Sequence, residues 1–247
     1  MAIRSPSLIV QAQPFTHGKG FIAYSIGQQS LGSSIHPFLQ LDHYYMSLPT
    51  FGEHPHQGIA AVTYMFEDSE GSFFNQDSQG DRSFIHPGDL HWTQAGSGVR
   101  HNETPTESGK LCHGIQMFVD LPSADKSAPA KALHLKSADM PVYKTSEGGR
   151  VRVVLGHTHG LTSPMPISVP IHFFDVTLPA GQKIEHNILT DQVAFLLMIR
   201  GTAKLGQAES SIQAQTAALF VPTGTTIQVQ ADSTDSTEVQ YVLCLAG

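Results

Sequence analysis

Residues 60–89 read AAVTYMFEDSEGSFFNQDSQGDRSFIHPGD and show how this chain is built. The apolar run Ala60–Phe66 and the shorter run Ser83–Ile85 are separated by two groups of turn-forming residues, Gly71-Ser72 and Ser78-Gln79-Gly80-Asp81. The stretch ends on a third turn signal, Pro87-Gly88-Asp89. Short apolar or β-branched runs bounded by Gly, Pro, Asp and Ser are typical of strands. The stretch therefore predicts short strands joined by tight turns.

The same pattern recurs along the whole chain, and helical periodicity is scarce. Many short strands at this spacing predict a β-sandwich or a β-barrel. Further strands are expected at Leu8–Val10, Phe21–Tyr24, Ile115–Val119, Val151–Leu155, His172–Leu178, Val193–Ile199, Ala217–Val221 and Thr226–Val229.

The composition is typical of a strand-rich globular protein. Hydrophobic residues make up 40% of the 247 residues and charged residues only 14%. The net charge is −7 and Lys and Arg form no block, which argues against direct binding of nucleic acid. Two cysteines, Cys112 and Cys244, are too few for a disulfide framework. Without a signal peptide or a long apolar stretch, we expect a cytoplasmic protein that does not span a membrane.

A polar connector and a weak internal repeat predict two domains. The connector is Pro122–Tyr143, which is rich in Ala, Lys, Ser, Asp and Pro and has room for a helical turn. Residues 48–52 (LPTFG) precede a His-rich segment and an apolar run, and residues 178–181 (LPAG) precede the apolar run Val193–Ile199. We therefore expect one domain at residues 1–135 and a second at residues 136–247, as a duplicated barrel would give.

Two short sequence motifs contain pairs of side chains that can bind a metal ion. His54-Pro55-His56 and His101-Asn102-Glu103 each place two metal-binding side chains at positions i and i+2, which face the same side of a strand. If the two strands are neighbours, three imidazole nitrogens and one carboxylate converge on one point. That ligand set suits a divalent transition metal and leaves coordination sites open. The alternative is that these histidines lie in surface loops.

The chain resembles the pirin family over residues 36–126. The resemblance is carried by ordered motifs that include the two pairs above and the turn Pro87-Gly88-Asp89. The matching segments are His36–His43, His54–Gly58, Val62–Tyr64, Gln76–Gly80, Pro87–Val99, His101–Glu103, Gly114–Pro122 and Ala124–Lys126.

The resemblance implies an all-β bicupin, with two antiparallel, jelly-roll-like cupin barrels in one chain. It also implies one metal ion in the first barrel, bound by His54, His56, His101 and Glu103. Iron is the common metal of the family, so Fe(II) is expected, with Mn, Ni, Cu and Zn as alternatives. By the internal repeat, Lys183–Glu185 and Ile227–Val229 take the places of the two pairs, so the second barrel is expected to lack a metal site.

Three positions depart from the family pattern. Asn102 replaces a usual Ser, Gln57 replaces a usual Arg, and His91 replaces a frequent Gln. These changes put the shape and charge of the pocket in doubt, and the roles of these residues and of Gln116 stay open. A further His-x-His pair, His157-Thr158-His159, lies between two glycines and is expected to be a solvated loop.

The resemblance leaves three functions open. The first is a quercetin 2,3-dioxygenase that opens a flavonol ring with dioxygen, with Glu103 as metal ligand and general base. The second is a metal- or redox-dependent regulator that binds a transcriptional or metabolic protein partner. The third is a cupin that binds another small acid or enol, because a fold alone does not decide function.

Overall fold

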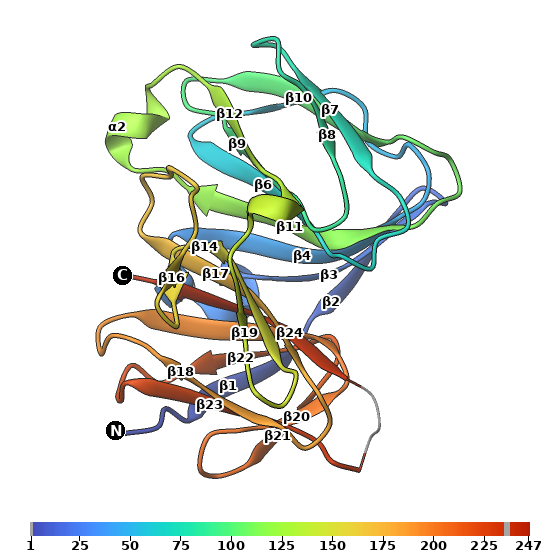
Figure 1. Cartoon of the computed structure of the whole chain (residues 1–247). Helices are drawn as coiled ribbons and strands as arrows, with labels where there is room; N and C mark the ends of the chain where they lie inside the picture. The colour runs from blue at the N-terminus through green and yellow to red at the C-terminus, as the bar shows by residue number, and fades with distance from the viewer. Residues whose placement is uncertain (1, 235–237) are drawn as a thin grey trace.

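The computed structural model describes residues 2–234 and 238–247. These residues form strands almost throughout, arranged as two stacked barrels (Figure 1). Residues from the first half of the chain form the upper barrel, drawn in cyan and green, and those from the second half form most of the lower one. All ten segments predicted as strands lie in strands, and the all-β prediction is confirmed.

The first barrel is built from one large and one small antiparallel sheet. The large sheet has the order β12-β9-β6-β11-β4-β3-β2 and the small one has the order β5-β10-β7-β8. The bounds are β2 Gln13–His17, β3 Phe21–Gly27, β4 Phe38–Met46, β5 His54–His56, β6 Ile59–Met65, β7 Phe73–Asp77, β8 Arg82–Ile85, β9 Leu90–Gln94, β10 Val99–Pro105, β11 Cys112–Asp120 and β12 Lys131–Leu135.

The second barrel repeats this plan strand for strand. Its large sheet has the order β1-β22-β19-β24-β17-β14-β13 and its small sheet the order β18-β23-β20-β21. A two-stranded hairpin, β15 His157–Thr158 with β16 Leu161–Thr162, is added to it. The bounds are β1 Pro6–Gln11, β13 Val142–Lys144, β14 Arg150–Leu155, β17 Ile171–Leu178, β18 Lys183–Asn187, β19 Val193–Arg200, β20 Thr202–Leu205, β21 Ser210–Gln213, β22 Thr216–Phe220, β23 Thr226–Ala231 and β24 Val239–Ala246.

The first strand of the chain lies in the second barrel. β1 pairs with β22 and takes the edge position that β12 takes in the first barrel. This corrects the assignment of all of residues 1–135 to the first barrel, and the rest of the division stays a proposal. The edge of β22 needs hydrogen-bond partners for its backbone, and a local sequence pattern does not show which distant segment supplies them.

Helices are few and short. α1 Gln28–Leu31 and α2 Ser123–Lys126 are single turns, and 3-10 turns occur at Ser33–Ile35 and Ser137–Asp139. The connector predicted at Pro122–Tyr143 contains α2, and it also contains β12 and the start of β13. No helix in residues 2–234 and 238–247 is long and apolar enough to cross a membrane.

The two large sheets face each other, and their facing side chains form the largest hydrophobic core. Phe38 of the first barrel meets Phe195 of the second edge to face, with ring centres 5.2 Å apart. Tyr64 and Phe173 meet in the same way at 5.6 Å. Such aromatic pairs stabilise the packing beyond the area they bury, so the barrels are joined by a true core.

The interiors of the two barrels differ. A large apolar cluster that includes Ile184, Leu205, Ile227 and Val229 fills the second barrel. In the first barrel the corresponding cluster is small, and much of the remaining interior is an open pocket. The hollow interior of the first barrel is therefore where a ligand has room.

Candidate metal centre

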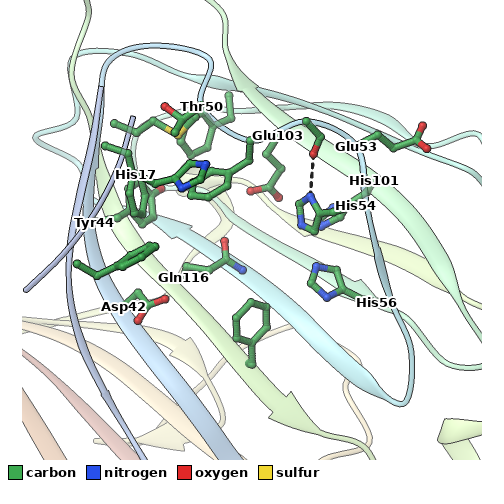
Figure 2. Close-up of a pocket in the computed structure, with 17 residues that line it drawn as sticks. His17, Asp42, Tyr44, Thr50, Glu53, His54, His56, His101, Glu103 and Gln116 are labelled. Atoms are coloured by element: carbon green, nitrogen blue, oxygen red, sulfur yellow. Dashed lines mark hydrogen bonds between the residues drawn. The ribbon is translucent and has the colours of Figure 1, made fainter. Parts of the chain in front are cut away.

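β5 and β10 are neighbours, and this pairing brings the two predicted pairs together. His101 lies directly opposite His54 in the antiparallel register, and Val99 lies opposite His56. β5 is the edge strand of its sheet, which accommodates Pro55, a residue that cannot donate a ladder hydrogen bond. The spacing within each pair turns all three imidazoles into the first barrel (Figure 2).

The three histidines are close enough to share one ion. One ring nitrogen from each of His54, His56 and His101 lies within 4.8 Å of the other two. The ring centres are 4.8 to 5.0 Å apart. Burial lowers the pKa of His56 to about 4 and that of His101 to about 3. His56 and His101 are therefore neutral near pH 7, which is the form that binds metal.

Outer hydrogen bonds orient two of the rings. His54 Nδ1 lies 2.9 Å from the carbonyl oxygen of Gly52, and His101 Nδ1 lies 3.2 Å from Asn75 Oδ1. Both acceptors lack hydrogens, so each Nδ1 carries the proton and each Nε2 keeps a free lone pair. The buried Asn75 is itself held by its Nδ2, which donates to Asp81 Oδ2 at 2.8 Å. This donor set fits a divalent metal.

We expect Asn75→Ala to weaken Zn²⁺ binding by roughly 10–100-fold, the usual effect of losing an outer partner of a metal-bound histidine. Without Asn75 the His101 ring is no longer held with Nε2 toward the other two rings. Competition with a chromogenic chelator measures the affinity, and circular dichroism checks the fold. Asn102→Ala, on the neighbouring strand β10, is the matched control. Wild-type affinity in Asn75→Ala would contradict the proposed orientation.

Glu103 faces the same pocket but is not part of the three-histidine group. Its Oε2 accepts a hydrogen bond of 2.6 Å from the Thr63 hydroxyl. Burial raises the pKa of Glu103 to about 7, and the Thr63 hydrogen bond opposes this shift. The structure thus places the predicted fourth ligand beside the histidines, and its role as a ligand stays a prediction.

The pocket beside the histidines is largely aromatic. It has a volume of about 470 Å³, within the range of about 300–1,000 Å³ typical of small-molecule sites. No Lys or Arg of the described chain lines it, and its carboxylates are Asp42, Glu53 and Glu103. Its aromatic lining consists of Phe15, Phe21, Tyr44, Phe51, Phe73 and Phe118, together with the histidines.

Comparison with known proteins decides the family. The Pirin family profile matches residues 21–119. A pirin-like protein of Caulobacter vibrioides is 31% identical over 254 residues, and the match covers 100% of this chain and 88% of that protein. The chain belongs to the pirin family.

Solved structures agree with this membership. A protein from Geobacillus kaustophilus is similar with a TM-score of 0.86 and 29% identity, over 99% of this chain and 97% of the other. Quercetin 2,3-dioxygenase from Acinetobacter baumannii is similar with a TM-score of 0.87 and 25% identity, over 99% and 87% of the two chains. The bicupin fold that the pirin resemblance implied is confirmed.

The positions that set this pirin apart are now placed. Gln116 lines the pocket, with Oε1 2.9 Å from the Thr63 hydroxyl oxygen. His91 faces neither the solvent nor the pocket lining, because it is 1% exposed and both of its ring nitrogens lack a partner among the described residues. Burial lowers the pKa of His91 to about 4. Gln57 is exposed and Asn102 is half-buried.

The second His-x-His pair of this pirin, His157-Thr158-His159, is less exposed than expected. His157 is exposed, but its ring contacts that of His172 with centres 4.7 Å apart. His159 is half-buried and stacks on Tyr143, with ring centres 4.2 Å apart. These contacts arise because the β15–β16 hairpin folds back onto the second barrel. The two rings pack against different partners, which differs from the predicted solvated loop.

In the second barrel the repeat is shifted by one residue from the predicted alignment. On β18 the buried residues are Ile184 and His186, whereas Lys183 and Glu185 are exposed. His186 Nε2 lies 2.7 Å from the hydroxyl of Tyr241. The alternation of a strand explains the shift, because moving the alignment by one residue exchanges the inner and outer faces.

Proposed function

We propose that this pirin is a metal-dependent oxygenase that opens a neutral, hydroxylated aromatic substrate with dioxygen, with a flavonol such as quercetin as the expected substrate. The observation that carries the proposal is the opening of three clustered imidazoles onto an aromatic pocket of about 470 Å³. The similarity to a quercetin 2,3-dioxygenase over nearly the whole chain supports the same reaction class.

The lining supports an aromatic substrate over a small acid. Flat rings such as Phe51, Phe73 and Phe118 pack well against a fused aromatic ligand. Apart from the proposed metal ion, a carboxylate substrate would find no positive partner, because no described Lys or Arg lines the pocket. This disfavours the third function, a cupin for small acids, because the pocket carboxylates would repel an anion.

His54, His56, His101 and Glu103 are the proposed metal ligands, with Fe(II) as the first candidate and Mn, Ni, Cu and Zn as alternatives. A bound ion would supply Lewis acidity and a template for the substrate oxygens. His54 and His101 contribute fixed Nε2 lone pairs, because their Nδ1 atoms are held by Gly52 and Asn75.

Glu103 is the proposed general base for the substrate hydroxyl. A base works best when its pKa lies near the working pH. Without a bound ion, burial raises the pKa of Glu103 to about 7, and a neighbouring cation would oppose this shift. Its Oε2 is held by Thr63, which leaves Oε1 facing the pocket side. Thr63 also gives the carboxylate a hydrogen-bond partner that does not depend on an ion, so Glu103 can take a proton without losing its position.

Turnover of quercetin by the Fe(II)-loaded protein tests the proposal. We expect one carbon monoxide released for each flavonol consumed, together with uptake of one dioxygen. Glu103→Gln should lower kcat by about 10²–10⁴-fold, the usual contribution of a general base. Absorbance at the flavonol band and carbon monoxide trapping give the two rates.

Two results would contradict the proposed dioxygenase function. A protein with a full complement of metal that consumes no flavonol would reject the reaction class. A Glu103→Gln variant with wild-type kcat would reject only the base. The regulatory alternative, a pirin that binds a protein partner, stays a prediction from the family resemblance.

A further inference from the structure

A row of polar side chains crosses the inner face of the large sheet of the first barrel. Ser25 lies opposite Asp42, Asp42 opposite Gln116, Gln116 opposite Thr63, and Thr63 opposite His91. Residues directly opposite one another on neighbouring strands share a face. The row therefore runs over β3, β4, β11, β6 and β9.

Two members of this row, Thr63 and Asp42, have different surroundings. Thr63 is bound to Glu103, beside the three histidines. Asp42 lies two strands away, on the other side of Gln116 from the histidines (Figure 2). With neighbouring strands about 4.8 Å apart, the backbone positions of Asp42 and Thr63 are separated by roughly 10 Å. A ligand that reaches from the histidines to Asp42 has several rings.

The Asp42 carboxylate is held in place and keeps an open acceptor position. Ser25 Oγ donates to Oδ1 at 2.5 Å. Gln40 Nε2 lies 2.9 Å from Oδ1 and 2.8 Å from Oδ2. A carboxylate can accept about four hydrogen bonds, so Oδ2, which accepts one, retains a free lone pair, and Asp42 lines the pocket.

No cation balances Asp42. It forms no ion pair with Lys, Arg or His in the described part of the chain, and no described Lys or Arg lines the pocket. Gln116, from β11, lies between it and the histidines (Figure 2), and Phe118 of the same strand lies against His56, with ring centres 5.5 Å apart. A half-buried carboxylate in an aromatic pocket gains most from a hydroxyl donor, since such a bond is stronger than one between neutral groups.

We propose that Asp42 is a specificity-determining residue, which accepts a hydrogen bond from a phenolic hydroxyl at the end of the substrate away from the metal-binding histidines. This rests on the proposed function and adds the substrate class to it: polyhydroxylated flavonols are favoured over flavonols that carry only the 3-hydroxyl. Ser25 and Gln40 are positioning residues, because they hold the carboxylate and do not line the pocket.

The test compares quercetin with 3-hydroxyflavone, which has the chelating 3-hydroxyl and 4-carbonyl and no other hydroxyl. Both are titrated anaerobically into the Zn²⁺-loaded protein, where binding is measured without turnover. Asp42→Asn keeps the shape of the side chain and should weaken quercetin binding about tenfold, the scale of one hydrogen bond to a charged group. The affinity for 3-hydroxyflavone should not change.

Two further variants sharpen the comparison. Ser25→Ala keeps the charge of Asp42 and should lower the preference for quercetin by a smaller factor. Glu107→Gln removes an exposed carboxylate paired with Lys110 and is the charge-matched control. In the Fe(II)-loaded protein Asp42→Asn should raise KM for quercetin and leave kcat unchanged, as loss of uniform binding does.

Each other outcome overturns the proposal. Equal loss of both flavonols would show that Asp42 is only structural, and no loss of either would show that it does not contact the substrate. If quercetin is turned over normally while the preference is unchanged in Asp42→Asn, only the role of Asp42 fails. If the wild-type protein neither binds nor consumes either flavonol, the proposed function fails together with it.

Discussion

His101→Ala should abolish stoichiometric metal binding and, with it, any metal-dependent turnover. The loss of affinity should exceed the roughly 10–100-fold expected for Asn75→Ala, because a ligand and not its outer partner is removed. His101 is central to the group, since its ring lies 4.8 Å from that of His54 and 5.0 Å from that of His56. Without it the two remaining imidazoles share a single edge strand.

Two measurements check this result. Elemental analysis of protein purified without chelator gives the metal content. Thermal unfolding with and without a chelator gives the stabilisation by the ion, which is about 4 kcal/mol when the metal is present at 1,000 times its Kd. The wild-type protein should lose stability on chelation, whereas His101→Ala should not respond.

A matched control comes from the second His-x-His pair, His157-Thr158-His159. His157→Ala removes an exposed histidine from the second barrel and should leave both metal content and chelator response unchanged. Stoichiometric metal in His101→Ala, or its loss in His157→Ala, would contradict the proposed site.

Arg152→Met should destabilise the protein by about 3 kcal/mol, the low end of the range for breaking a buried ion pair, because Arg152 is buried but Glu67 is partly exposed. Arg152 is 4% exposed and joins the two barrels. Its Nε donates to the hydroxyl of Tyr64 at 3.0 Å and its Nη2 to the carbonyl oxygen of Gly88 at 2.8 Å, while Nη1 pairs with Glu67. Without the guanidinium, the Tyr64 hydroxyl and the Gly88 carbonyl lose this donor, and Glu67 keeps only Arg150.

The buried Asp175 adds to this loss. Tyr64 donates to Asp175 Oδ2 at 2.8 Å, so the tyrosine links the arginine to a second carboxylate. Burial raises the pKa of Asp175, and Arg152 opposes that shift. Removing the positive charge leaves a carboxylate in the barrel interface without a compensating cation.

Arg150→Met is a close control for this variant. Arg150 lies on the same strand and binds the same Glu67, with an Nη2–Oε2 distance of 2.8 Å, but it is exposed. Exposed ion pairs contribute about 0–1 kcal/mol, so its loss should be small. Urea unfolding of the two variants gives the difference, and equal effects would show that the inter-barrel network is not a stabilising element.

Features that depend on residues close together in the chain could be predicted from the sequence, whereas contacts between distant residues could not. Strand segments such as Ala60–Phe66 and Val193–Ile199 were predictable because apolar runs and turn residues are local signals. β4 and β24 were missed, although both lie in the middle of a sheet. His43 and Asp42 interrupt the apolar pattern of β4, so the local signal there was weak.

The residues around the metal site were less predictable than the histidines. Asn75 contacts His101 only because β7 pairs with β10, and Thr63 reaches Glu103 from the opposite sheet. Asp42 was part of a motif that matched the family, but its place in the pocket follows from the register of β4 with β11. No local signal in the sequence shows these contacts.

The sequence by itself determined the strands, the two His-containing pairs and their common faces, because side-chain direction along a strand alternates with a period of two. The tertiary structure alone decided which strands are neighbours: β5 beside β10, β1 in the second barrel, and the polar row from Ser25 to His91. The sequence does not show which strands are neighbours, because strand pairing joins backbone groups that lie far apart in the chain. Every strand offers the same backbone donors and acceptors, so these groups do not identify the partner. The packing of the whole barrels, and not the local sequence pattern, decides which strands pair.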